Sequence, residues 1–141
     1  MATSEIGIPL MEDGLRHLKT RAGVAGAVNA VLTEDWAFGD SYTDITTVKN
    51  IATHVILDAT IGQPQGDGAS PPGREITVGA FQFASADNTT TTGTTLHVCL
   101  VDTVNSTVLA VNDVSNDQAI TAGNPVNVAS YKIGISQAPQ S

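Results

Sequence analysis

The stretch TLHVCLVDTVNSTVLAVNDV, residues 95 to 114, decides what kind of fold this chain forms. Both of its halves are rich in Val, Leu and Thr, which are residue types that favour extended strands. The short polar segment Val104-Asn105-Ser106 lies between them, as a turn lies between the strands of a hairpin. The stretch therefore predicts a β-hairpin. Its His97, Cys99 and Asp102 also raise the question whether this hairpin carries a chemical site.

Alternation along the first half of the hairpin sorts its side chains onto two faces. One face carries Leu96, Val98 and Leu100, and the other carries His97, Cys99 and Val101. A neighbouring Cys and His are what a nucleophile pair or half of a zinc site requires. The two other histidines, His17 and His54, belong to a predicted helix and a distant strand, and nothing in the sequence makes them converge. We therefore expect a small buried Cys99 beside a partly exposed His97, and no metal site.

Signatures of other reaction classes are absent or weak. The chain has no G-x-S-x-G segment, and Ser106, the serine nearest His97 along the hairpin, is a turn residue. Glu34 and Asp35 are adjacent in a polar loop, and Asp67 is alone in its loop, whereas a calcium loop needs several carboxylates. No glycine-rich phosphate loop precedes a helix. We expect no catalytic residue, no cofactor and no enzymatic activity.

The composition restricts the partners. A chain of 141 residues falls within the range of one domain. Its formal net charge is −8, from fourteen acids against six bases, and no basic cluster is available to neutralise phosphates, so nucleic acid is not expected as a partner. The sequence has no apolar run of about 20 residues and no secretory signal, so we expect no membrane association and synthesis in a cytoplasm. A single cysteine excludes a disulfide within the chain.

One amphipathic segment precedes the strands. Apolar residues recur at the spacing of one helix face: Met11, Leu15, Leu18 and Ala22. Acids are expected in the first turn (Glu12 and Asp13) and bases in the last (Lys19 and Arg21), and the segment is flanked by Pro9 and Gly23. These features are typical of a helix whose charges suit its dipole. They predict a helix over 9–22. Residues 1–8 are expected to form an arm that depends on a neighbour for its order.

The remaining chain has the pattern of short strands between turns. Strands are predicted over 25–32, 52–60 and 74–84, the last with a bulge or kink near Gly79 and Ala80, and two more around the Gly123-Asn124-Pro125 turn. A polar connection over 33–50 is expected to hold a helical turn over 42–48, capped by Ser41, and a Gly- and Pro-rich loop covers 62–73. Seven or eight short strands at this spacing indicate an all-β fold, a β-sandwich or jelly roll with one short N-terminal helix. The domain is expected over 9–136, followed by a tail over 137–141.

The order of several segments provides a resemblance to a known family. These segments are SYTDITTVK (41–49), LDAT (57–60), PPGREITV (71–78), the hairpin TTLHVCLVDTVNSTVLAV (94–111) and TAGNPVNVASYKIGIS (121–136). In this order the chain resembles the capsid decoration, or cement, proteins of tailed double-stranded DNA bacteriophages, over about residues 40–136. It departs from them at YKIGI (131–135), where related segments often end in an aspartate-rich strand. The resemblance implies a jelly-roll-like β-sandwich bound outside the capsid across joints between major capsid subunits.

These arguments lead to an expected function with one alternative. We expect a structural virion protein on the capsid exterior, made in the host bacterial cytoplasm, whose partners are the major capsid protein and further copies of itself, as a dimer rather than a trimer. The candidate contact residues are Ile6, Ile8, Trp36, Phe38 and Tyr42. The alternative is a phage head or tail surface module that recognises a host carbohydrate. Its stacking platform would be the rings of Trp36, Phe38 and Tyr42.

Overall fold

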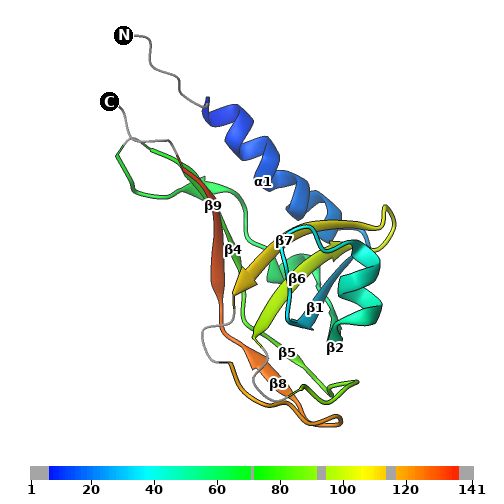
Figure 1. The fold of residues 1–141 in the computed structure, drawn as a ribbon. Coiled ribbons are helices and arrows are strands. Elements are labelled where there is room, and N and C mark those ends of the chain that lie inside the picture. Colours follow the sequence, from blue (N-terminus) through cyan, green and yellow to red (C-terminus); the bar gives the residue numbers. More distant parts are fainter. Residues whose placement is uncertain (1–6, 71, 92–94, 114–116, 137–141) are drawn as a thin grey trace.

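The computed structural model describes residues 7–70, 72–91, 95–113 and 117–136, which are mostly β (Figure 1). In these ranges one α-helix, α1 (Ile8–Ala22), precedes nine strands in antiparallel sheets, and two short helical segments, a π-helical turn (Asp44–Val48) and a 3-10 helix (Asp58–Thr60), lie between strands. The strands are β1 (Val28–Glu34), β2 (Asn50–Val55), β3 (Gln65–Gly66), β4 (Arg74–Val78), β5 (Phe81–Phe83), β6 (Leu96–Asp102), β7 (Thr107–Asp113), β8 (Val126–Val128) and β9 (Tyr131–Ile135). They form a four-stranded sheet, β2-β1-β6-β7, a three-stranded sheet, β3-β4-β9, and a two-stranded sheet, β5-β8. This arrangement is consistent with the predicted β-sandwich.

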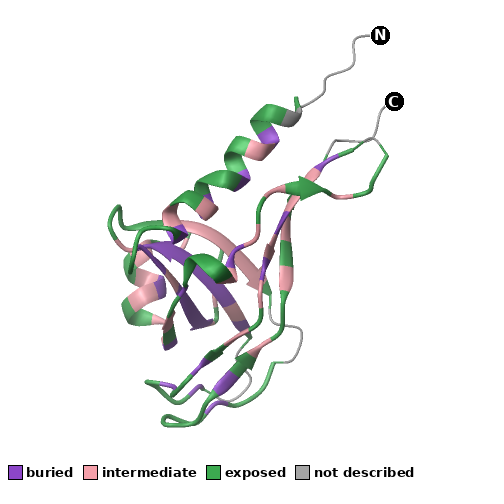
Figure 2. Cartoon of the chain, turned by 180° about the vertical axis from the view of Figure 1, so that it is seen from behind, coloured by how far each residue is buried: buried purple, intermediate pink, exposed green. Residues whose placement is uncertain are grey.

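The predicted hairpin is confirmed and lies in the largest sheet. β6 pairs with both β1 and β7, and its residues Leu96, Val98 and Leu100 point into the main core, as the alternation predicted. Cys99 and Val101 point to the opposite face, where they pack with Val31 and Ile45 in a second group that we call the outer cluster. Figure 2 shows buried residues concentrated on this sheet. Both faces of the sheet are therefore covered.

The predicted kink near Gly79 is confirmed, and it is larger than a bulge. β4 ends at Val78 and pairs with β9, whereas β5 begins at Phe81 and pairs with β8 in another sheet. The N–H of Gly79 donates to the carbonyl oxygen of Thr60 at 2.7 Å, and the N–H of Gly62 donates to the carbonyl oxygen of Thr77 at 2.9 Å, so Val78 forms an isolated antiparallel bridge with Ile61 just before the chain leaves β4. Strands that switch sheets at such bends are a normal way to build a sandwich corner.

Helix α1 agrees with its prediction except in its first turn. The helix begins at Ile8, so its first turn contains no acid, and Glu12 and Asp13 lie in the second turn. Glu12 instead forms an ion pair with Arg74 of β4 at 3.2 Å, so tertiary contact replaces the expected dipole effect. The bases Lys19 and Arg21 do lie in the last turn. No helix in the described ranges is long and apolar enough to cross a membrane.

The strand predicted over 52–60 ends early. β2 stops at Val55, and residues Asp58–Thr60 form a short 3-10 helix. The Ile56 N–H still donates to the carbonyl oxygen of Val28, the first residue of β1, at 2.9 Å, so the pairing ends where the partner strand begins. Beyond this point the ammonium of Lys19 donates to the carbonyl oxygens of Asp58 and Ile61 at 2.8 and 2.7 Å and also pairs with the Asp58 carboxylate at 3.0 Å. A side chain from α1 therefore holds the 3-10 helix that follows β2.

The two strands expected around the Gly123 turn both follow it. β8 and β9 lie after the turn, and residues 117–121 before it are not a strand. There the Thr90 hydroxyl accepts from the N–H of Ile120 at 2.8 Å, while the Thr90 N–H donates to the Ile120 carbonyl at 2.9 Å. These contacts satisfy backbone groups without a strand partner. The loop over 62–73 also contains the two-residue strand β3, which sequence reasoning did not predict.

Replacing Gly73 by Ala tests how the β3–β4 loop meets β9. An added Cβ would overlap the Asp67 carboxylate and the backbone carbonyl of Ile135, and the carbonyl belongs to a paired strand. We expect Gly73→Ala to lower the free energy of unfolding by about 1–3 kcal/mol in urea denaturation. The matched control is Gly134→Ala in β9, where a Cβ would lie 3.5 Å from the nearest atom, an ordinary contact. Equal midpoints for the two variants would contradict this packing.

Candidate functional site

The hairpin pair His97 and Cys99 lies on the face of the sheet that carries the outer cluster. Cys99 is fully buried, and burial raises the pKa of its thiol. Since the thiolate is the reactive form of cysteine, this environment disfavours nucleophilic attack. The position of Cys99 therefore suits packing within the outer cluster.

His97 has neighbours that do not form a catalytic arrangement. Its ring lies 5.2 Å from the Trp36 ring, and its Nε2 is 3.9 Å from Oδ1 of Asp113, whose side chain is 76% exposed. Its buried Nδ1 has no hydrogen-bond partner among the described residues. The ring of His54 is elsewhere, stacked on Phe81 at 5.2 Å. In the described ranges, no three His, Cys, Asp or Glu side chains lie together in a way that could hold a metal ion.

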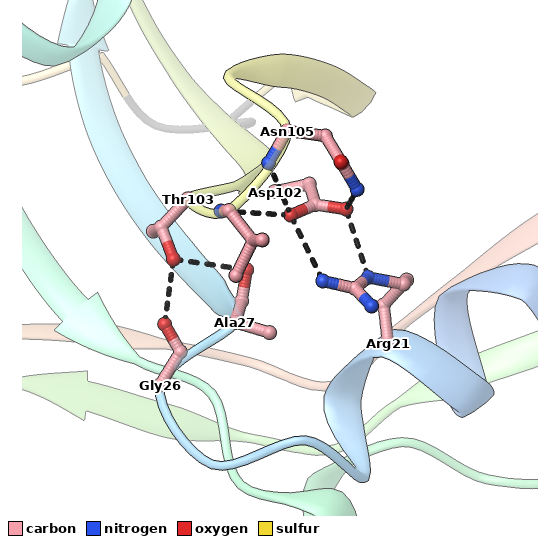
Figure 3. Close-up of polar contacts among 7 residues, drawn as sticks. Arg21, Gly26, Ala27, Asp102, Thr103 and Asn105 are labelled. Atoms are coloured by element: carbon pink, nitrogen blue, oxygen red, sulfur yellow. Dashed lines mark hydrogen bonds and ion pairs between the residues drawn. The ribbon is translucent and has the colours of Figure 1, made fainter.

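Asp102, the third member of the sequence cluster, lies at the other end of β6 and joins two parts of the chain (Figure 3). Its carboxylate accepts hydrogen bonds from the N–H groups of Val104 and Asn105 at 3.0 and 3.1 Å, and from the Asn105 side-chain amide at 2.9 Å. Nε and Nη2 of Arg21 donate to it at 2.9 and 3.3 Å. Because Arg21 is in the last turn of α1, one carboxylate fastens the helix end to the hairpin turn.

The electrostatics of this contact keep Asp102 ionised. Burial alone would raise the pKa of its carboxyl, but the hydrogen bonds from Asn105 and Arg21 outweigh burial and hold that pKa well below its usual range. Beside it, the Thr103 hydroxyl donates to the carbonyl oxygen of Gly26 at 2.7 Å, which ties the same turn to the α1–β1 connection. Of the residues that raised the question of a chemical site, Cys99 therefore packs in the outer cluster and Asp102 supports the hairpin turn.

The three candidate aromatic residues are placed differently by the connection between β1 and β2. Trp36 and Tyr42 are partly buried and pack against the outer cluster. Phe38, between them in sequence, is 97% exposed. The predicted helical turn after Ser41 is confirmed, and the Ser41 hydroxyl accepts from the Asp44 N–H at 3.1 Å. This turn places Ile45 on the sheet and holds the connection against it.

A second feature of the same connection was missed from the sequence. Lys49 donates from its ammonium to the Asp40 carboxylate at 2.7 Å and to the carbonyl oxygen of Asp35 at 2.9 Å. The Asp40 carboxylate also accepts from the Ala37 N–H at 2.8 Å. The contacts from Lys49 and Ala37 hold the pKa of Asp40 below its usual range. The turn that carries Phe38 is therefore fixed at both ends, and no sequence motif announces a pair nine residues apart.

Two candidate contact residues give less information. Ile6 lies outside the described residues, and Ile8 is the first residue of α1, with its side chain outside the description.

The described surface also contains a pocket of about 270 Å³ between the ends of β6 and β7 and the β8–β9 connection. Its lining includes Leu96, Asn112, Asp113, Gln118 and Tyr131. Its ionisable groups are the carboxylate of Asp113 and the phenol of Tyr131, and burial raises the pKa of that phenol.

Asp102→Asn tests the contact between α1 and the hairpin. At neutral pH we expect a loss of about 3 kcal/mol in the free energy of unfolding, because a buried ion pair loses one partner. The folded pKa is lowered, so the contribution of Asp102 is present above its ordinary pKa of 3.8 and is lost as the pH falls below it. The difference between wild type and variant should therefore shrink as the pH falls below about 4.

The matched control for this series is Asp113→Asn, an exposed carboxylate on the neighbouring strand. We expect it to change the free energy of unfolding by about 0.5 kcal/mol or less, as substitutions of exposed residues do. A pH-independent difference for Asp102→Asn would show that the carboxylate does not act through its charge.

Cys99 gives a simple chemical test. With a buried thiol of raised pKa, the native protein should not react with iodoacetamide at neutral pH, whereas the urea-unfolded protein should be alkylated once. Intact-mass measurement distinguishes the two states. Rapid alkylation of the folded protein would mean that the outer cluster opens, and stoichiometric zinc binding would refute the packing role of Cys99.

Comparisons with known proteins found no match, so the functional argument uses the structure itself. The chain matches no protein-family model, no curated protein sequence and no solved structure. The fold described above, and the exposed and buried side chains on it, are therefore the basis of the functional argument.

Proposed function

We propose that this chain is a non-enzymatic structural protein of a tailed bacteriophage virion, which binds the outer surface of the capsid and stabilises contacts between major capsid subunits. The observation that carries the proposal is the exposure of Phe38, at 97%, on a connection that is otherwise packed and hydrogen-bonded. An aromatic ring held in water by an ordered turn is typical of a residue that is covered by another protein. The resemblance to capsid decoration proteins supplies the identity of that protein.

Other described features support an intermolecular role. Further large apolar side chains are exposed at 65–69% in α1, at the end of the helical turn and after β2: Leu10, Val48 and Leu57. The net charge of −8 suits a protein that must stay soluble before assembly and must not bind the packaged DNA. Many copies bound to one shell would add their individual affinities through avidity.

The proposal includes two finer points. One is a jelly-roll-like arrangement of the sandwich, which is supported by the passage of the chain from one sheet to another between β4 and β5. The other is a homo-oligomer, a dimer rather than a trimer, located on the capsid exterior. The alternative, recognition of a host carbohydrate, is less favoured because Trp36 and Tyr42 pack against the outer cluster and only Phe38 of the proposed platform is largely exposed.

Particles that lack the protein distinguish these functions. A clamp opposes expansion and rupture of the shell, so depleted particles should release their DNA at a lower temperature or a weaker osmotic shock than complete particles. They should adsorb to host cells at an unchanged rate. Re-addition of the purified protein should restore stability and serves as the control. Normal stability together with slow adsorption would refute the clamp and favour the carbohydrate-binding alternative.

A further inference from the structure

We infer that Phe38 is an anchor that inserts into an apolar pocket bordered by Lys or Arg side chains on the partner protein. This inference rests on the proposed function, under which the partner is the major capsid protein. It adds the residue that carries the contact and the chemistry of the surface that receives it. Three observations support it: the exposure of the ring, the rigidity of its turn and the charges around it.

The exposed ring contributes nothing to the core of its own chain. Trp36 and Tyr42 on either side pack against the outer cluster, while Phe38 remains 97% exposed. Its removal should therefore leave folding unchanged. Full burial of a Phe ring in a partner would strengthen binding by roughly 10- to 100-fold in Kd.

The turn around Phe38 is organised before any partner binds. The N–H of Asp40 donates to the Ala37 carbonyl at 3.0 Å, and the Asp40 carboxylate accepts from the Ala37 N–H at 2.8 Å. Gly39 has a φ of +95°, which a residue with a side chain rarely adopts, and Lys49 joins Asp40 to the Asp35 carbonyl. Because the backbone that carries the ring is already ordered, little backbone entropy is lost on binding.

The charges near the ring select the kind of partner. Four carboxylates lie on either side of the ring in sequence, that of Glu34 at the end of β1 and those of Asp35, Asp40 and Asp44 in the connection, against the single ammonium of Lys49. Lys49 is already paired with Asp40, so the remaining field is negative. A pocket bordered by Lys or Arg would complement this field and speed association.

A second copy of this chain is a poorer receiver. The described pocket between β7 and the β8–β9 connection is of a size to admit part of a ring, but its lining includes Asp113. In that arrangement the acidic connection that carries Phe38 would face the carboxylate of Asp113 rather than a base. The charge argument therefore favours a different protein with basic residues at the contact.

The test measures binding of the purified protein to shells that have been depleted of it. We expect Phe38→Ser to raise Kd by roughly 10- to 100-fold with an unchanged melting temperature. The matched control is Val104→Ser, which removes another apolar side chain, 67% exposed, from the turn at the opposite end of the four-stranded sheet. It should bind like wild type. Lys49→Met should weaken binding less than Phe38→Ser does, through a looser turn.

Salt dependence tests the basic border of the pocket. Binding of wild type should weaken as ionic strength rises, and Asp35→Asn should reduce that dependence. Wild-type affinity of Phe38→Ser would overturn the inference and remove Phe38 as support for the proposed function, which would then rest on the binding of the protein to depleted shells. Binding that strengthens with salt would overturn the basic border. Failure of the wild-type protein to bind depleted shells would overturn the proposed function and the inference with it.

Discussion

The buried carboxylate of Asp102 connects parts of the chain that are far apart in sequence, and the arrangement of the elements depends on it. It accepts hydrogen bonds from the turn after β6 and from Arg21 at the end of α1. Removing one partner of a buried ion pair is costly, so the helix end and the hairpin turn stabilise each other. The Thr103 hydroxyl adds a tie to the start of β1 through Gly26. The four-stranded sheet, the helix and the connection between them are thereby held in one relative position.

This framework leaves the opposite end of the sheet to the connection between β1 and β2. That connection covers the outer face of the sheet with Trp36, Tyr42 and Ile45, and its ends are joined by Lys49. Because the rings of Trp36 and Tyr42 already pack against the outer face of the sheet, Phe38 is not needed for packing and remains exposed to water. The same segment therefore completes the fold and leaves an apolar residue exposed, which is the residue of the proposed contact. We regard these two roles of the connection, packing through Trp36 and Tyr42 and exposure of Phe38, as the structural basis of the proposed capsid contact.

Sequence reasoning was most accurate where local pattern and burial agree. The hairpin, the two faces of β6, the helix over most of its length, the helical turn after Ser41 and the break at Gly79 all follow from periodicity, capping and glycine chemistry. The candidate site was anticipated only in part. The buried state of Cys99 was predicted, but nothing in the pattern of Trp36, Phe38 and Tyr42 reveals which of the three rings faces water.

The sequence by itself determined the strand-rich class, the positions of the main turns and the acidic surface, because these depend on residue type and short spacing. Tertiary structure alone decided the course of the chain after β2, where Lys19 of α1 donates to the carbonyl oxygens of Asp58 and Ile61, and the irregular course before β8, where Thr90 and Ile120 hydrogen-bond to each other. It also decided the roles of Asp102 and Asp40, whose cationic partners are 81 and 9 residues away. Such contacts form between side chains brought together by folding, and their energies depend on burial and geometry that no local pattern contains.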